Sequence, residues 1–122
     1  MWTHKQSTGE LFAPLTGEVV DIGYSGFEEG KNNPAMQHVR MVGPIPEGFY
    51  TIEEPRDTAE HGPYAMPLMP DETNEMFGRS GFLIHGDSVL HLGAASEGCP
   101  IHSHAARIRV WASGDHRLRV IP

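Results

Sequence analysis

Glycine and proline make up about a fifth of this chain, and no other feature limits its secondary structure as strongly. The 122 residues include 14 glycines and 10 prolines. Glycine lowers the stability of helices and proline interrupts them, so short strands joined by turns are favoured over long helices. A chain of this length is typical of one domain, and 39% hydrophobic residues supply a core. We therefore predict a single, mainly β domain that spans residues 1–122.

Segments of alternating or β-branched residues predict where the strands lie. Residues 10–15 and 18–24 flank Thr16 and Gly17, which is typical of a two-residue hairpin turn. Residues 81–85 form the clearest strand in the sequence. Further strands are predicted at residues 37–42, 49–52, 65–69 and 118–121.

One helix is predicted to begin directly after Cys99. Pro100 is a favoured first helical residue, and Gly114 supplies a stop signal. Between them, apolar residues recur near helical spacing at Ile101, Ala105, Ile108 and Ala112. The fold class that follows is a β-rich domain with one or two short helices.

The charge of the chain limits its partners. Acidic residues outnumber basic residues 16 to 9, and the net charge is −7. Nucleic-acid binding needs a positive surface, so we expect no nucleic-acid partner. No apolar run approaches the roughly 20 residues that a spanning helix needs, so we expect no membrane partner. The first five residues lack the apolar segment of a secretion signal, and we expect no classical signal peptide.

Cys99 is the only cysteine, so it is either a buried structural residue or a reactive thiol. A position at the start of a helix would favour its ionised form. Gly98 would let a ligand approach the backbone closely, and N–H groups at a helix start can hold an oxyanion. His85, fourteen residues earlier, is a candidate base for the thiol.

Two charged residues near this pair have both a functional and a structural interpretation. Asp87 lies two residues after His85 and would either orient its imidazole or remain a solvated loop residue. Arg79 precedes the predicted strand and would either bind a substrate carboxylate or form a surface ion pair.

The eight histidines raise the alternative of a zinc site. His102 and His104 form a pair, and His85, His91 and His116 are further candidate ligands. However, residues two apart on a helix do not share a face, and the chain has neither an H-E-x-x-H motif nor paired cysteines. We therefore expect no metal site and no other cofactor, with the histidines of the final helix facing solvent.

Two blocks, residues 78–88 and 95–99, resemble the L,D-transpeptidase signature. In that signature a strand ends in histidine and glycine, and a loop then leads to a Ser/Thr-x-Gly-Cys motif. Residues 23–26, 31–34 and 43–50 extend the likeness, and the chain resembles the Tlde1 family of type VI secretion L,D-transpeptidase effectors over about residues 2–121.

This resemblance implies an L,D-transpeptidase-like β-sandwich or barrel and a cysteine enzyme of peptidoglycan. Such enzymes attack the bond between the L-centre of meso-diaminopimelate and D-alanine in the stem tetrapeptide, and they form a thioester. Water then gives L,D-carboxypeptidase activity, and a D-amino acid gives exchange. The implied nucleophile is Cys99 and the implied base is His85, with Gly86 beside it. The N–H groups of Gly98 and Cys99 would hold the oxyanion, and Ser96 would shape the loop.

The sequence departs from the signature at two positions. Glu97 stands where a second histidine is usual, and Pro100 stands where an aliphatic residue is usual. Glu97 favours an antibacterial effector over a housekeeping crosslinker, whereas Pro100 bears on where the helix starts and on the effect of its dipole. An effector made in the bacterial cytoplasm and delivered to a rival's periplasm would have secretion-system components and a cognate immunity protein as partners. The alternatives are a housekeeping L,D-transpeptidase and a non-catalytic wall-binding module.

Overall fold

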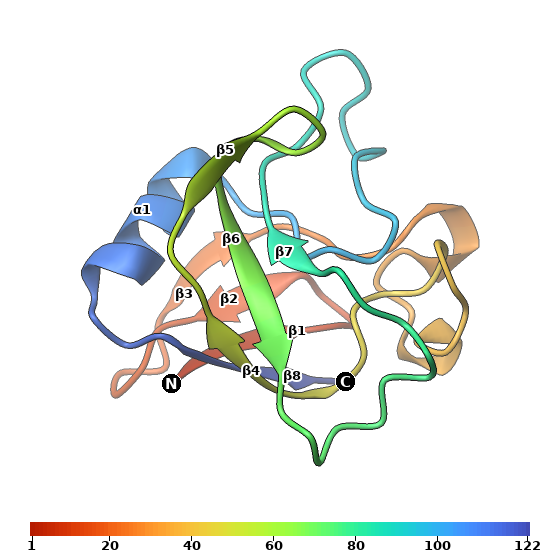
Figure 1. Ribbon diagram of the computed structural model, residues 1–122, viewed down its shortest axis with the longest axis horizontal. Helices are drawn as coiled ribbons and strands as arrows, with labels where there is room; N and C mark the ends of the chain where they lie inside the picture. Colours follow the sequence, from red (N-terminus) through yellow and green to blue (C-terminus); the bar gives the residue numbers. More distant parts are fainter.

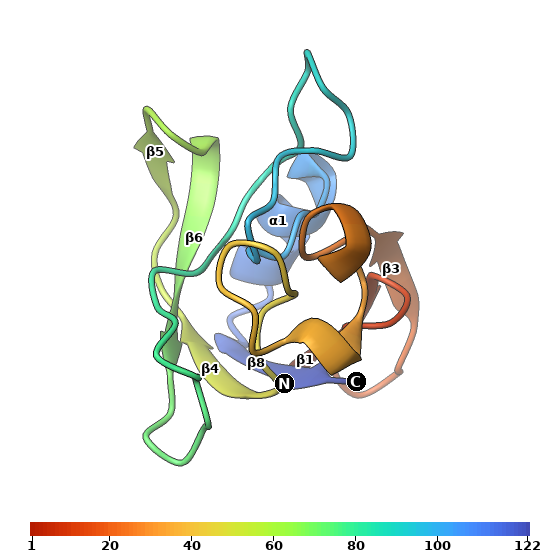
Figure 2. The same ribbon diagram turned by 90° about the vertical axis from the view of Figure 1, so that its right-hand side faces the viewer.

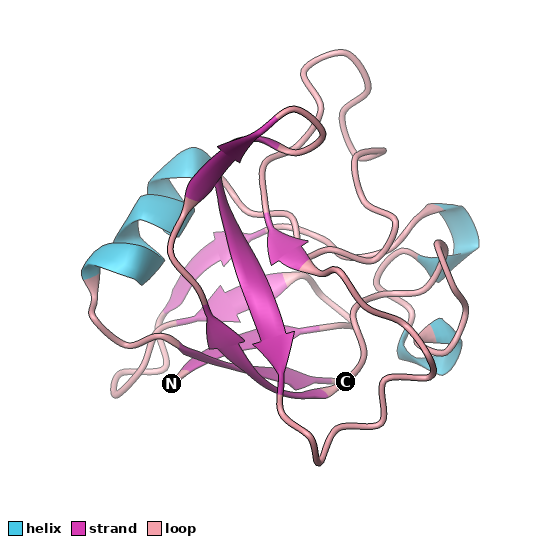
Figure 3. Cartoon of the chain, viewed as in Figure 1, coloured by secondary structure: helices cyan, strands magenta, loops and turns pink.

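The computed structural model describes residues 1–122 and is mainly β, as the sequence predicts (Figure 3). One α-helix, α1 (His104–Ala112), is accompanied by two short 3-10 helices, η1 (Glu28–Gly30) and η2 (Pro34–Met36). None of these helices combines the length and the apolar character that crossing a membrane requires. The strands are β1 (Trp2–Lys5), β2 (Glu10–Phe12), β3 (Val19–Ile22), β4 (Gly48–Ile52), β5 (Arg56–Thr58), β6 (Gly62–Pro70), β7 (Leu83–Ile84) and β8 (Arg117–Ile121).

The strands form one curled sheet of mixed direction. Their order is β3-β2-β1-β8-β4-β6-β5, and β7 pairs with β6 beside this path. The first and last strands, β1 and β8, are parallel neighbours, while the other pairs are antiparallel. Figure 2 shows the sheet as a trough, with β5 and β6 on one side, β3 on the other and α1 lying within the curve. The two termini lie at the base of the trough, at opposite ends of the parallel pair β1 and β8 (Figure 1).

The concave face of the sheet carries the core, because alternate residues of each strand point toward it. In β4, Tyr50 and Ile52 are buried, and in β8 Leu118 and Val120 are buried, while the residues between them are not. The helix closes this core with one face. The buried apolar cluster comprises Trp2, Leu11, Ile45, Tyr50, Ile52, Met66, Leu68, Phe82, Ile84, Cys99, Ala106, Val110, Leu118 and Val120.

Most predicted strands are confirmed, but two segments differ from the prediction. Residues 37–42 form a series of turns, in which Gly43 donates its N–H to the Val39 carbonyl. The strand predicted at residues 81–85 is shorter, since only Leu83 and Ile84 pair with β6. By contrast, β6 extends over nine residues and is the longest strand of the sheet.

The helix begins later than predicted. Its N-cap is Ser103, whose hydroxyl accepts a hydrogen bond from the Ala106 N–H at 3.1 Å. Residues 100–102 are extended instead, because Ile101 exchanges two backbone hydrogen bonds with Tyr24. The buried face of α1 is formed by Ala106, Arg107 and Val110, so the predicted apolar face at Ala105, Ile108 and Ala112 is wrong. Gly114 does follow the helix end in a left-handed conformation, as predicted.

Arg107 joins the helix to the sheet through hydrogen bonds to backbone carbonyls. Its Nε donates to the carbonyls of His102 and Ser103, and its Nη1 donates to those of Pro63 and Tyr64 at 2.7 and 3.0 Å. The side chain is buried, so these oxygen atoms replace water as partners of the guanidinium. Arg107 therefore fixes the start of β6 against the segment that precedes α1.

We predict that Arg107→Lys lowers the free energy of unfolding by about 2–4 kcal/mol, because an ammonium group cannot reach the four carbonyls that the guanidinium holds. The matched control is Arg109→Lys on the same helix, which changes an exposed ion pair with Glu18 and should shift stability by about 0.5 kcal/mol or less. Urea denaturation of the two variants measures the difference. Equal effects at the two positions would contradict the assigned role of Arg107.

Candidate active site

Backbone pairing places Cys99 beside the strand that carries His85. His85 donates its N–H to the Pro100 carbonyl at 3.2 Å, and its own carbonyl accepts from the His102 N–H at 3.1 Å. These two bonds hold the segment after Cys99 parallel to the chain at the end of β7. The Leu83 N–H then points at the Cys99 Sγ, 3.4 Å away. The sheet therefore determines where both predicted residues lie.

Cys99 and His85 open into the same cleft, which has a volume of about 500 Å³. That volume is in the range typical of small-ligand sites. No hydrogen bond joins the Sγ of Cys99 to the His85 ring, so each side chain faces the cleft separately. The other lining residues are Arg40, Met41, Glu60, His61, Gly78, Arg79, Ser80, Gly81, Phe82, Ala94, Ala95 and Glu97.

The thiol of Cys99 is held in its neutral form. The side chain is only 9% exposed, and burial raises the pKa of the thiol, with the nearby Glu97 carboxylate acting in the same direction. The Leu83 N–H and the Arg79 charge oppose this shift without cancelling it. The helix start that the sequence predicts to favour ionisation does not lie at Cys99. Instead, α1 starts beyond Ser103, so Cys99 lies outside the positive end of the helix.

The imidazole of His85 is neutral as well. Burial lowers its pKa to about 4, against a weaker opposing effect from the Gly86 carbonyl, and His61 and Arg107 lower it further. That carbonyl lies 2.9 Å from Nδ1 and can only accept, so Nδ1 carries the ring proton. The Nε2 atom is left as a lone-pair acceptor with no partner in the protein. A neutral imidazole with a free Nε2 has the form that a general base needs.

Asp87 forms no hydrogen bond with His85. Its carboxylate accepts hydrogen bonds from the Tyr24 hydroxyl at 2.6 Å and from the N–H groups of Ser88 and Gly93, both at 2.9 Å. Asp87 thus organises the loop between His85 and Cys99, and the Gly86 carbonyl takes the orienting position for the imidazole. Gly86 is packed closely, since a Cβ there would lie 2.7 Å from the Arg107 guanidinium.

The loop before Cys99 is held by the hydroxyl groups of two buried serines. Ser96 Oγ donates to the Cys99 carbonyl at 2.7 Å and accepts from the N–H groups of Gly26 and Gly98. Ser25 Oγ donates to the Gly98 carbonyl at 2.6 Å. Gly98 has a φ of +132°, a conformation that other residues rarely adopt. The Gly98 N–H is already bonded to Ser96, whereas the Cys99 N–H donates no hydrogen bond to another residue.

Arg79 is a buried clamp in this structure. It is 6% exposed, and it donates to the carbonyls of Gln37, Gly43, Pro44 and Glu97. It forms no ion pair, and both terminal nitrogens of its guanidinium are bonded to these carbonyls. The guanidinium therefore ties the turn at residues 37–44 to the loop that carries the cysteine.

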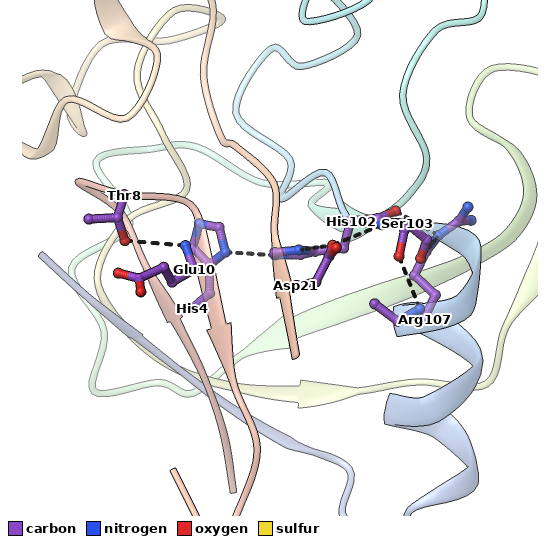
Figure 4. Close-up of polar contacts among 8 residues, drawn as sticks. His4, Thr8, Glu10, Asp21, His102, Ser103 and Arg107 are labelled. Atoms are coloured by element: carbon purple, nitrogen blue, oxygen red, sulfur yellow. Dashed lines mark hydrogen bonds and ion pairs between the residues drawn. The ribbon is translucent and has the colours of Figure 1, made fainter. Parts of the chain in front are cut away.

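A buried histidine pair next to the site is not apparent from the sequence. His102 Nδ1 donates to Asp21 at 2.9 Å, and His102 Nε2 lies 2.9 Å from Nδ1 of His4 (Figure 4). Both rings are buried, so the prediction that His102 faces solvent on the helix is wrong. The Asp21 carboxylate also accepts from the Ser103 N–H, and the network fixes the extended segment that follows Cys99. No three His, Cys, Asp or Glu side chains are arranged to hold a metal ion.

Comparison with known protein families identifies the family to which the chain belongs. Residues 21–121 match the family model of the Tlde1 domain, and the chain belongs to this family, as its sequence motifs predict. The matched range includes every residue that lines the cleft. Membership indicates a type VI secretion effector. A comparison with curated proteins finds no match.

We predict that Cys99 reacts slowly with iodoacetamide at neutral pH. The environment raises the thiol pKa, so the alkylation rate should rise with a midpoint above pH 9.0, the ordinary value. Mass spectrometry of the modified protein across pH 6–10 gives the profile. Glu97→Gln should move the midpoint down by less than about one pH unit, because the carboxylate is exposed. A rate that is already at its plateau at pH 7 would contradict the neutral thiol.

We also predict that the protein loses stability in mild acid. The pKa of His85 is about 4 in the folded state, and burial holds that of His4 well below 6.5. An unfolded chain therefore takes up protons that the folded chain does not. The contribution of these two residues is complete above pH 6.5 and declines as the pH falls toward 4. Urea denaturation at several pH values measures the slope, which should be shallower in His4→Leu. An unchanged slope in that variant would contradict the prediction.

Proposed function

We propose that this member of the Tlde1 domain family is a cysteine enzyme that acts on peptidoglycan stem tetrapeptides. Its reactions are L,D-carboxypeptidase cleavage and D-amino-acid exchange, both through a thioester on Cys99. The observation that supports this most directly is the shared cleft, which is lined by both a thiol and a neutral imidazole with a free Nε2. The family membership supports the setting of an antibacterial effector delivered to a target cell's periplasm.

In the proposed acylation step, the Cys99 sulfur attacks the carbonyl carbon on the L-centre of diaminopimelate. The thiol proton moves to His85 Nε2 as the S–C bond forms, and the carbonyl oxygen gains the negative charge. In the proposed step the Cys99 N–H, which donates to no other residue, donates to that oxygen. When the intermediate collapses, the C–N bond breaks and the imidazolium returns its proton to the nitrogen of D-alanine.

The thioester is then resolved by a second nucleophile. His85 accepts a proton from water or from the amine of a D-amino acid, and the C–S bond breaks to regenerate the thiol. Water yields a tripeptide, and a D-amino acid yields an exchanged tetrapeptide. Either product removes the tetrapeptide donor that wall crosslinking uses. A cognate immunity protein would protect the producing cell by covering the cleft.

We predict that Cys99→Ala abolishes the release of D-alanine, and that His85→Ala lowers its rate about 10²- to 10⁴-fold, the usual range for a general base. The measurement is mass spectrometry of tetrapeptide muropeptides incubated with each variant, with and without a D-amino acid. The control is His91→Ala, an exposed loop residue outside the cleft.

Three outcomes of this experiment would contradict the proposal. Turnover by Cys99→Ala would exclude the thioester. If the unmodified protein leaves the muropeptides intact, the remaining interpretation is a non-catalytic wall-binding module. New 3–3 crosslinks in place of tripeptides would identify a crosslinking transpeptidase.

A further inference from the structure

Arg40 is the one cation lining the cleft whose donors are uncommitted. The cleft has two arginines, and four carbonyl contacts occupy both terminal nitrogens of Arg79. Arg40 is exposed and forms no hydrogen bond or ion pair within the protein. A guanidinium facing a cleft with free donors is suited to bind a carboxylate through two parallel hydrogen bonds.

The turn that carries Arg40 is fixed at both ends. Arg79 bonds to the Gln37 carbonyl on one side of Arg40 and to the Gly43 and Pro44 carbonyls on the other. The same guanidinium reaches the Glu97 carbonyl, two residues before the nucleophile. One buried side chain thus sets the turn and the cysteine loop relative to each other. Arg79 acts as the positioning residue, and Arg40 is the residue that it presents.

The turn that carries Arg40 also contains a residue with a strained backbone. Met41, next to Arg40, has a φ of +64°, a left-handed conformation that costs free energy in a residue other than glycine. The Met41 side chain is also exposed and lines the cleft. The strained residue is therefore one that packing in the core does not require, and it lines the cleft beside Arg40.

The other charged residues of the cleft limit where an anion can bind. Glu60 and Glu97 are negative and exposed, and Glu60 lies 3.7 Å from the His61 ring. The chain as a whole is acidic, with a net charge of −7. A substrate carboxylate is repelled by both glutamates, so the Arg40 side of the cleft is where it is stabilised.

We propose that Arg40 binds the terminal carboxylate of the substrate, and that this contact makes the enzyme selective for stem peptides that end in a free D-amino acid. The inference rests on the proposed function, because it assigns D-alanine as the leaving group. D-alanine carries its carboxylate one residue beyond the bond that breaks. A peptide whose terminal carboxylate is blocked or extended cannot make the contact.

The same contact would select the incoming acceptor in exchange. Exchange is the reverse of D-alanine release with a different amino acid, so the acceptor's carboxylate occupies the same position. Loss of Arg40 should therefore lower the yield of exchanged tetrapeptide more than the yield of tripeptide. Water carries no carboxylate and does not use the contact.

The test compares two substrates, the stem tetrapeptide with a free terminal carboxylate and the same peptide as its terminal amide. For the unmodified protein we expect kcat/KM to be about ten- to a hundredfold higher for the acid, the range for a hydrogen bond to a charged group. In Arg40→Gln the preference should fall below about threefold, through a lower rate on the acid alone. Arg40→Lys should keep an intermediate preference. The control is Arg119→Gln, an exposed arginine on β8 outside the cleft.

A preference that is absent in the unmodified protein, or kept in full by Arg40→Gln, would overturn the inference. Binding to Cys99→Ala separates this outcome from failure of the proposed function. Isothermal titration should show tighter binding of the acid than of the amide, and Arg40→Gln in the same background should remove the difference. Tighter acid binding without any turnover would reject the proposed reaction and keep the carboxylate site. Equal turnover of acid and amide would keep the proposed reaction and reject the carboxylate site.

Discussion

The pairing of the His85 strand with the segment after Cys99 is the constraint on which the cleft depends. Two backbone hydrogen bonds hold the pairing, and Ile101 forms a second bridge to Tyr24 on its other side. An extended backbone between two neighbours has little freedom to shift. The positions of the thiol and the imidazole are thus properties of the sheet rather than of the long loop between them.

Two buried arginines bind loop carbonyls that in other folds would be paired within long helices or strands. With so many glycines and prolines, the chain leaves much of its backbone in loops whose carbonyls need partners. Arg79 and Arg107 supply these partners, each bonding to four carbonyls and each joining segments that are distant in the sequence. The two clamps lie at different parts of the site, one beneath the cysteine loop and one beneath Gly86. Their contribution is positional, because a guanidinium fixes the direction of every carbonyl that it binds.

The sequence predicts local features of this protein well and tertiary ones poorly. The hairpin around Thr16, the strand at Phe49 and the last strand follow from alternation and turn residues, which are local signals. The start of the helix could not be predicted in this way, because the Tyr24–Ile101 bridge overrides the preference of Pro100 for a first turn. For the same reason the sequence gives no sign that Arg79 is buried or that His102 meets His4, since both depend on residues more than thirty positions away.

The neutrality of both candidate residues defines how the proposed reaction is activated. Burial raises the pKa of the Cys99 thiol and lowers that of the His85 imidazole, so the protein does not maintain a separated thiolate and imidazolium. Proton transfer becomes favourable only while the sulfur's developing charge is passed on to the substrate carbonyl. Activation of the thiol is therefore coupled to correct placement of that carbonyl, and a contact that places the substrate raises the rate of the chemical step. In the proposed reaction, binding of the substrate carboxylate and acid–base chemistry at Cys99 are then parts of one mechanism.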